Sequence, residues 1–320
     1  MVTVVVAARE RFGSALESLR SVFDHTGLPF RLIYVDGGSP ARLHNRLQRL
    51  SRERGFTLIR RNHWLTGNEA RNLALEQVDT RYTVFLENDV LVTPGWLEAL
   101  VGCAEATGAA IVGPLQLLGP VERGFVHVAG GDCHIVTENG RRRFEDRRHF
   151  ADTSLAEVRD QLKRMPCEQI EYHCMLVRTE AVRSVGLDPE LRNSMEYHDL
   201  CMQLRARAQS VYFEPAALVT YLPGDRLDWY ERAFFLWRWD ERIIERSLQH
   251  FARKWNLDAE HPGTEATLNY ARWHRKHAWH RLPLLGWIRP GWIRRRMLAP
   301  PARALGRFIA LAGGLARRTA

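Results

Sequence analysis

Short apolar runs rich in β-branched residues alternate with amphipathic helix patterns over the first 113 residues, and this alternation limits the chain to few folds. The helix patterns between the runs place apolar residues three or four positions apart. Strands that alternate with helices at this spacing indicate a parallel sheet covered by helices on both faces. The strand-like runs are Val2 to Ala8, Arg31 to Asp36, Phe56 to Arg60, Tyr82 to Leu86 and Ala109 to Gly113.

Two local signals predict where helices begin. Ser14 and Glu17 have the S-x-x-E spacing of a capping box, ahead of a pattern that contains Leu19. Thr93 and Pro94 are typical of the N-cap and first residue of a helix. We therefore expect helices to start directly after Ser14 and Thr93.

The rhythm changes after Gly113. Phe125 to Val128 and Cys133 to Val136 flank a pair of glycines, so they predict a hairpin, and the polar stretch from Arg141 to His149 predicts a loop excursion. We interpret residues 114–165 as an insertion. Strand and helix patterns then resume. A strand is expected from Tyr172 to Val177 and a helix from Met195 to Ala208. Two short strands are expected to follow, Val211 to Phe213 and Ala217 to Thr220.

Charge divides the chain into unlike parts. Of its 46 Lys and Arg residues, 12 lie between Ala271 and Ala320, where there is no Asp or Glu, so the tail carries +12 and the remainder −3 of the net +9. We predict an α/β domain over residues 1–225, an aromatic-rich helical extension over 226–270 and a basic amphipathic tail over 271–320.

Carboxylates follow the predicted strands at the sheet edge where open α/β sheets bind ligands. Asp36 ends the second strand, and Glu87 and Asp89 flank Asn88 at the end of the fourth. Grouped carboxylates repel unless a cation lies among them. Mg²⁺ or Mn²⁺, bound also by phosphate oxygens, fits this set of ligands, so the sequence predicts a divalent cation and a diphosphate at this edge.

These motifs, in this order, resemble glycosyltransferase family 2. The family's P-T-Y-N-R corresponds to Ala7 to Arg11 here, its V-D-D-G-S to Val35 to Ser39, its G-x-x-x-A-R-N to Gly67 to Asn72, and its D-x-D to Glu87 to Asp89. The likeness runs from Val2 to about Tyr221. It implies a GT-A fold, which is a Rossmann-like, mostly parallel sheet flanked by helices, here with an inserted β-ribbon and a helical basic C-terminal extension.

The resemblance also assigns roles to individual residues. It implies that Glu87 and Asp89 hold the metal. The residues implied to bind the nucleotide of the sugar donor are Ala8, Arg9, Glu10, Asp36, Gly67, Arg71 and Asn88.

A later family motif, E-D-x-D-L, corresponds to Glu196 to Leu200. Tyr197 replaces the aspartate that many relatives use as general base, so that role falls to Glu196 or Asp199, and the sequence does not choose between them. His173 and Tyr197 stand where relatives place residues that face the acceptor. Tyr221 stands where many relatives have a histidine that helps to hold the metal.

The implied reaction is transfer of a sugar, with inversion, from a nucleotide-diphosphate donor to a glycan or lipid-linked acceptor, as in the synthesis of cell-surface polysaccharide or glycolipid. A sugar-phosphate nucleotidyltransferase is disfavoured because no glycine-rich loop follows the first strand. A catalytically inactive, basic-tailed binding protein on the same scaffold is the other alternative. Nucleic acid is not expected as a partner, since the positive charge is confined to a Trp-rich tail.

The tail predicts a membrane surface as a partner. Tryptophan and isoleucine alternate with arginine between Trp273 and Arg296, which suits a segment lying on anionic lipid. The longest apolar run near the C-terminus, Phe308 to Ala316, is shorter than the roughly 20 residues that span a bilayer. Five cysteines without a C-x-x-C pair favour a reducing compartment. Together these features predict a cytoplasmic protein that binds the inner face of the cytoplasmic membrane peripherally.

Overall fold

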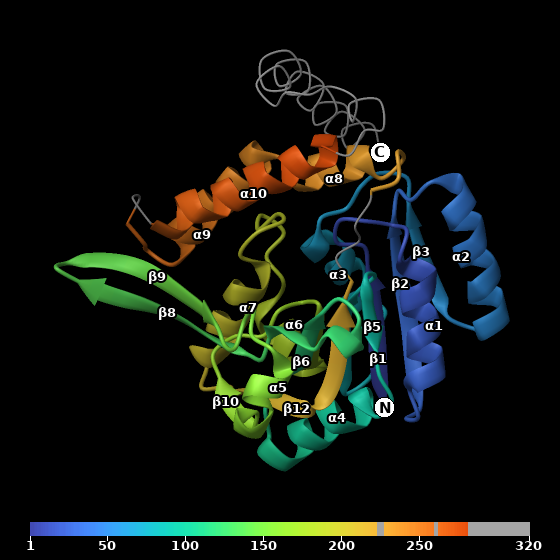
Figure 1. Cartoon of the computed structure of the whole chain (residues 1–320), viewed down its shortest axis with the longest axis horizontal. Coiled ribbons are helices and arrows are strands. Elements are labelled where there is room, and N and C mark those ends of the chain that lie inside the picture. The colour runs from blue at the N-terminus through green and yellow to red at the C-terminus, as the bar shows by residue number, and fades with distance from the viewer. Residues whose placement is uncertain (223–226, 259–261, 281–320) are drawn as a thin grey trace.

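A mixed, mostly parallel sheet forms the centre of the computed structural model, which describes residues 1–222, 227–258 and 262–280 (Figure 1). Its path runs β10-β12-β6-β11-β4-β1-β2-β3, with β5 beside β12 and β7 beside β6. All the path strands except β10 and β11 point in one direction. The strands are β1 Val2–Ala7, β2 Phe30–Gly37, β3 Thr57–Arg61, β4 Tyr82–Glu87, β5 Val90–Val92, β6 Ile111–Leu118, β7 Phe125–Val128, β10 Met165–Cys167, β11 Cys174–Arg178 and β12 Val211–Tyr221.

Helices cover both faces of this sheet, as the alternation predicts. Every residue of β1 is buried, with Val4 and Val6 in one apolar cluster and Val5 and Ala7 in the other. The first cluster includes residues of α1, α2 and α4, and the second includes residues of α3, α6 and α7. The helices are α1 Ala15–His25, α2 Ala41–Arg54, α3 Gly67–Leu75, α4 Trp96–Thr107, α5 Leu155–Val158, α6 Thr179–Val185 and α7 Glu196–Arg205, with single turns η1 Val121–Arg123 and η2 Arg159–Gln161.

The helix start predicted after Ser14 is confirmed, whereas the start predicted after Thr93 is displaced. Helix α1 does begin after Ser14, but the Ser14 side chain makes no capping hydrogen bond. Helix α4 begins at Trp96, two residues later than the Thr93-Pro94 signal predicts. Gly95 adopts a φ of 81°, a conformation that costs glycine little, and the Thr93 hydroxyl donates to the carbonyl of Leu218 on β12 instead of capping the helix.

The insertion pairs differently from the predicted hairpin. Strand β7 lies antiparallel to β6 in the main sheet, whereas β8 (Gly131–Glu138) pairs with β9 (Arg141–Arg148) as a separate two-stranded ribbon. The polar stretch predicted as a loop is therefore a strand. The prediction failed because β9 is largely exposed and is held by cross-strand ion pairs, such as Arg147 with Asp132, rather than by an apolar face. The ribbon extends away from the sheet (Figure 1).

The last two predicted short strands form one strand. Strand β12 runs from Val211 to Tyr221 beside β6, and its register shifts between Glu214 and Leu218. This irregularity contains Pro215, which lacks the amide hydrogen of a regular ladder. The break in the apolar pattern therefore marks a bulge rather than a strand end.

Three helices of the C-terminal part lie across the end of the sheet opposite the N-terminus (Figure 1). They are α8 (Arg232–Arg238), α9 (Glu241–Lys254) and α10 (Pro262–His280). The Phe234 ring stacks on Phe12 at 4.5 Å between centroids, and Trp237 packs against Trp64. The predicted basic tail thus begins inside α10, and its residues 281–320 lie outside the described part of the chain. Within the described residues, no helix combines the length and apolar character needed to cross a bilayer.

Buried Glu231 fastens α8 to the loop that follows β1. Its Oε1 accepts hydrogen bonds from the backbone amides of Phe12 and Gly13, at 2.7 and 2.6 Å, and its Oε2 accepts one from Asp228. We expect Glu231→Ala to lower the free energy of unfolding by about 1–3 kcal/mol, because the buried Phe12 amide and the amides of Gly13 and Asp228 would lose their acceptor. Urea denaturation checks this. Glu245→Ala, at an exposed position on α9, is the control, and equal losses in both variants would contradict this role for Glu231.

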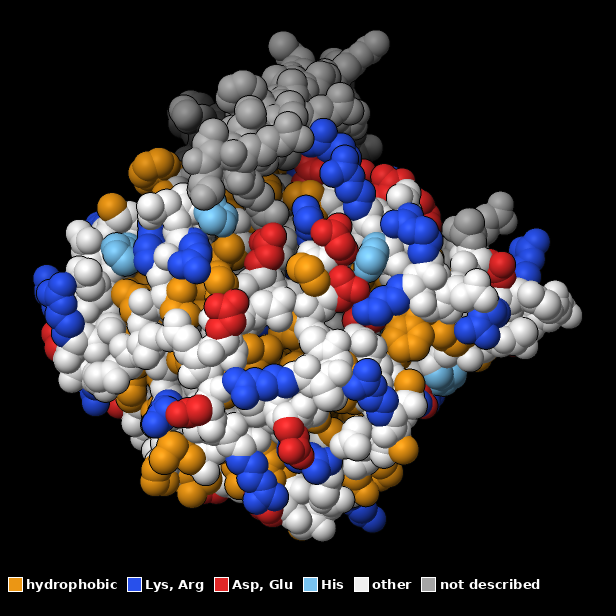
Figure 2. All heavy atoms as spheres, turned by 180° about the vertical axis from the view of Figure 1, so that it is seen from behind, with side chains coloured by type: hydrophobic (Ala, Val, Ile, Leu, Met, Phe, Trp, Pro, Cys, Tyr) orange, Lys and Arg blue, Asp and Glu red, His pale blue; other side chains and the backbone are white. Residues whose placement is uncertain are grey.

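Charges of both signs are interspersed on the face drawn in Figure 2, with no broad basic area among the described residues of that face.

Candidate active site

The carboxyl ends of β2, β1 and β4 lie side by side at the candidate site. Val35, Ala7 and Glu87 are aligned across these strands, so Asp36 and Asn88 follow at the same edge of the sheet. Two predicted site residues that lie far apart in sequence, Asp36 and Asn88, are therefore brought to one edge.

Asp36 is fully buried and extensively paired. Its Oδ1 accepts a hydrogen bond from the Ser39 amide at 2.9 Å, while its Oδ2 lies 2.9 Å from His44 Nδ1 and accepts from Arg60. These partners hold the loop after β2 in a fixed shape. Asp36 can therefore orient a nucleoside in two ways. It can hold the loop that contacts the nucleoside, or it can accept a hydrogen bond from the nucleoside in place of one from His44 or Arg60.

Glu87 lies among positive and titratable groups. Arg9 Nε, Arg71 Nη2 and His173 Nε2 approach its carboxylate at 3.5, 3.6 and 3.6 Å. The Glu87 carboxylate alone would repel a diphosphate. The guanidinium groups of Arg9 and Arg71 can neutralise the negative charge of a diphosphate, so it can bind here.

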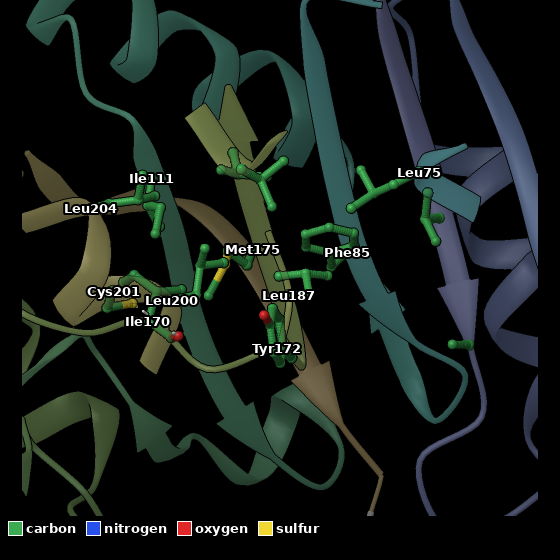
Figure 3. Close-up of a cluster of buried hydrophobic side chains, with 14 of the residues drawn as sticks. Leu75, Phe85, Ile111, Ile170, Tyr172, Met175, Leu187, Leu200, Cys201 and Leu204 are labelled. Carbon is green, nitrogen blue, oxygen red and sulfur yellow. Dashed lines mark hydrogen bonds between the residues drawn. The ribbon is translucent and has the colours of Figure 1, made fainter. Parts of the chain in front are cut away.

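Arg71 is held in place by the start of α3. Its guanidinium carbon lies 3.5 Å from the centroid of the Tyr172 ring, which itself stacks edge-on against Phe85 in the core drawn in Figure 3. A Cβ at Gly67 would lie 2.5 Å from Arg71 Nη1. Gly67 therefore makes room for Arg71, and Thr66 with Glu69 forms the capping box that begins the helix.

Asn88 braces the loop after β1. Its side-chain amide donates to the carbonyl of Arg11 at 2.7 Å, its backbone amide donates to Ala7, and its Oδ1 lies 3.4 Å from the amide of Arg9. The stretch predicted to bind the nucleotide, which includes Ala8 and Glu10, is thus shaped by the residue at the centre of the predicted metal motif.

Asp89 is completely buried, and neither of its carboxyl oxygens has a hydrogen-bond partner among the described residues. Burial, together with the charges of Glu87 and Glu10, raises the pKa of Asp89 from 3.8 to about 8. Buried carboxyl oxygens without partners are costly unless a ligand completes them. Asp89 and Glu87 therefore fit a divalent cation, since Mg²⁺ and Mn²⁺ favour oxygen ligands.

Glu10 is a further buried carboxylate at the site. It accepts hydrogen bonds from the Tyr221 hydroxyl and from Trp239 Nε1, both at 3.1 Å. Burial raises the pKa of Glu10, but the charges of Arg9 and Arg11 outweigh it and lower the pKa to about 2. Tyr221 stands at the position where the resemblance implies a histidine ligand. Its hydroxyl instead donates a hydrogen bond to Glu10 and so helps to hold the loop after β1.

The two candidates for the general base have different surroundings. Asp199 accepts hydrogen bonds from Lys254 Nζ and Gln203 at 2.8 Å and from Trp255 Nε1 at 2.9 Å, so it joins α7 to α9. Glu196 begins α7, and its charge acts on the buried guanidinium of Arg238, which also interacts with Glu87. Both carboxylates act on the pKa of Tyr172, which lies against Arg71, but Asp199 is occupied by structural partners.

His173 and Tyr197, the predicted acceptor-facing residues, occupy different surroundings. His173 is buried beside Glu87 and Arg9. Tyr197 packs edge-on against Tyr172 and lies against His198, with ring centroids 6.3 and 4.0 Å apart. Tyr172 connects them, because it precedes His173 and contacts both Tyr197 and Arg71.

Residues of the C-terminal helices complete the site, and the sequence alone does not assign them. Arg238 is buried, donates to the carbonyl of Asn193 and lies 4.7 Å from the Trp239 ring, which stacks on His274 of α10. Burial lowers the pKa of Arg238 against the raising effect of Glu196 and Glu10. The only signal was a charged residue inside the aromatic run from Phe234 to Trp239, which is otherwise typical of packing.

The chain belongs to glycosyl transferase family 2, whose family model matches residues 3–162. It is 28% identical over 235 residues to the pre-mycofactocin glycosyltransferases of two Mycobacterium tuberculosis strains, CDC 1551 and H37Rv. That match covers 73% of this chain and 45% of the relatives, so the chain spans about half the length of the curated relatives it matches.

The fold is shared with solved GT-A glycosyltransferases. A structure of GalNAc-T7 with UDP, GalNAc and Mn²⁺ has a TM-score of 0.54 at 14% identity, covering 85% of this chain and 56% of that one. The mannosyltransferase PcManGT from Pyrobaculum calidifontis, in complex with GDP-Man and Mn²⁺, has a TM-score of 0.53 at 13% identity, covering 98% and 86%. The predicted family and fold class are confirmed.

Proposed function

We propose that this protein transfers a sugar from a nucleotide-diphosphate donor to an acceptor hydroxyl, with a divalent cation at Glu87 and Asp89. The observation that carries the proposal is the Asp89 carboxyl, buried without partners among the described residues, next to Glu87 and the guanidinium groups of Arg9 and Arg71. Buried carboxylates with a structural role usually have their own hydrogen bonds, so the unpartnered Asp89 oxygens support a bound cation.

The residues divide the work of an inverting displacement. Arg9 and Arg71 neutralise the charge that grows on the leaving diphosphate. Glu196 takes the proton from the acceptor hydroxyl, and attack from the face opposite the leaving group inverts the anomeric centre. A cation bound at Asp89 supplies further charge stabilisation to the diphosphate. Arg238 is a positioning residue that keeps the Glu196 charge next to the site.

The acceptor is proposed to be a glycan or a lipid-linked molecule, in the synthesis of cell-surface polysaccharide or glycolipid. The curated relatives are named for a different acceptor, pre-mycofactocin, and that compound belongs in the same acceptor screen. On the donor side, UDP and GDP-mannose in the two similar structures suggest which nucleotides to test first.

A hydrolysis assay with UDP- and GDP-sugars and Mn²⁺ tests the proposal. Release of nucleoside diphosphate that depends on Mn²⁺ is expected. Absence of release with every donor, in a protein that still binds nucleotide, would instead support the inactive binding protein. Release of pyrophosphate from a nucleoside triphosphate and a sugar phosphate would support the nucleotidyltransferase.

We further propose that the basic tail, residues 271–320, binds the anionic inner face of the cytoplasmic membrane. Each basic residue near an anionic surface contributes about 1 kcal/mol. Deleting residues 281–320, which lie beyond α10, is expected to reduce cosedimentation with phosphatidylglycerol vesicles at least about tenfold and to leave neutral phosphatidylcholine vesicles unaffected. Equal cosedimentation of the full chain and the shortened chain would contradict the proposal.

A further inference from the structure

A second group of metal-ligand side chains lies beside the candidate active site. His127 on β7, with Glu171 and His173 just before β11, each offer one ligand atom, and these three atoms lie within 4.8 Å of one another. Glu171 Oε2 lies 2.9 Å from His173 Nδ1 and 3.3 Å from His127 Nε2. Glu171 and His173 are buried, and His127 is largely so.

The three atoms lie close enough together to converge on one metal ion. Ligands of a tetrahedral Zn²⁺ at about 2.1 Å from the ion lie about 3.4 Å from each other. Two imidazoles and one carboxylate favour a transition metal over Mg²⁺ or Ca²⁺, which prefer oxygen ligands. His127 Nε2 makes no hydrogen bond of good geometry within the described structure, and its polar neighbour at 3.3 Å is Glu171 Oε2, the same oxygen that faces His173.

We propose that His127 Nε2, Glu171 Oε2 and His173 Nδ1 bind a divalent transition metal such as Zn²⁺, at a site separate from the cation of Glu87 and Asp89. The His173 ring divides the two sites, because its Nδ1 faces Glu171 while its Nε2 lies 3.6 Å from Glu87. The Tyr221 ring borders the proposed site, with its centroid 4.5 Å from that of His173 and 5.5 Å from that of His127.

Metal binding at this site changes which atoms Arg9 can bind. Arg9 Nη1 lies 2.5 Å from His173 Nε2, and an arginine can only donate, so without metal the imidazole proton is on Nδ1 and donates to Glu171. A metal on Nδ1 moves that proton to Nε2. The imidazole remains neutral, Nε2 becomes a donor toward Glu87, and Arg9 Nη1 loses its acceptor on His173. Nη1 can then bind a donor phosphate while Arg9 Nε keeps its ion pair with Glu87, so occupancy of the second site prepares the first.

Metal stoichiometry tests this site without relying on transfer. The full chain, treated with EDTA and dialysed, is titrated with Co²⁺, and bound metal is measured by elemental analysis and by visible absorption. We expect the wild type to bind about two Co²⁺ per chain, and His127→Ala and Glu171→Gln to bind about one each. Asp89→Ala should also bind about one, and it should keep the visible absorption of Co²⁺ bound by histidine. His134→Ala serves as the control, because His134, which lies on the ribbon, pairs with the single carboxylate of Glu168.

A second measurement follows the imidazole proton. Zn²⁺ is added to the protein while nitrogen-15 NMR of the histidine side chains reports which ring nitrogen carries the proton. We expect Zn²⁺ to move the His173 proton from Nδ1 to Nε2 in the wild type and not in His127→Ala.

The results separate this inference from the proposed function. Wild-type stoichiometry and absorption in a folded His127→Ala variant would overturn the second site and leave the Glu87 and Asp89 site standing. Loss of one Co²⁺ in His127→Ala with no loss in Asp89→Ala would support the second site and count against the first.

Discussion

Replacing Asp89 with asparagine is expected to abolish cation-dependent donor binding while raising the melting temperature of the metal-free protein. The variant removes the charge that the cation requires and keeps the size of the side chain. Loss of a metal ligand at a phosphate-binding site is expected to lower turnover by at least about 10³-fold. Donor hydrolysis with Mn²⁺ measures the loss, and thermal unfolding in EDTA measures the gain in stability.

The sign of the stability change follows from linkage. The native pKa of Asp89, raised to about 8, lies above the ordinary 3.8 of an unfolded chain. Between these values the native state keeps a proton that the unfolded state has lost, so stability falls as pH rises from about 4 to about 8. An asparagine side chain cannot ionise, and the advantage of Asp89→Asn should therefore grow over this pH range. A variant that is less stable than the wild type at pH 8 in EDTA, or that keeps Mn²⁺-dependent hydrolysis, would contradict the assignment.

Replacing Glu196 with glutamine is expected to reduce kcat by about 10²–10⁴-fold, which is the usual contribution of a general base. The KM for the donor should change little, because Glu196 is not placed among the donor-binding groups. The variant tests the choice that the sequence left open between two carboxylates of one helix.

Asp199→Asn is the matched control for Glu196→Gln. It weakens the link of α7 to Lys254 and Trp255, so we expect a loss of about 1–3 kcal/mol in the free energy of unfolding and a smaller loss of kcat. Steady-state kinetics and urea denaturation of both variants separate the roles. A large kcat loss in a fully folded Asp199→Asn variant, beside near-normal turnover in Glu196→Gln, would assign the base to Asp199.

Local patterns predicted the sheet well because its strands are buried on both faces. The run Val2 to Ala7 could form little else, and the register then carries Asp36 and Asn88 to one edge of the sheet. Strand partners were harder to predict. The alternation in Phe125–Val128 indicates a strand without indicating β6 as its neighbour, and the arginines of β9 are typical of a loop until Asp132 is found opposite them.

The C-terminal part of the site was not predictable for a different reason. Trp239 reaches Glu10 and Glu231 reaches Phe12 across more than 200 positions of sequence, and no local periodicity reports such contacts. Likewise, the histidines at 127 and 173 each fit a structural role when considered alone. Only the structure shows that both histidines lie beside Glu171 and that the three side chains form one candidate metal site.

Anomalous diffraction from crystals grown with Mn²⁺ and a UDP- or GDP-sugar tests the central claim most directly. We expect an anomalous peak about 2.2 Å from an Asp89 carboxyl oxygen, with the donor's diphosphate bound to the same ion and contacted by Arg71. A diphosphate and its Mn²⁺ bound elsewhere on the protein, with the Asp89 oxygens still without a partner, would contradict it.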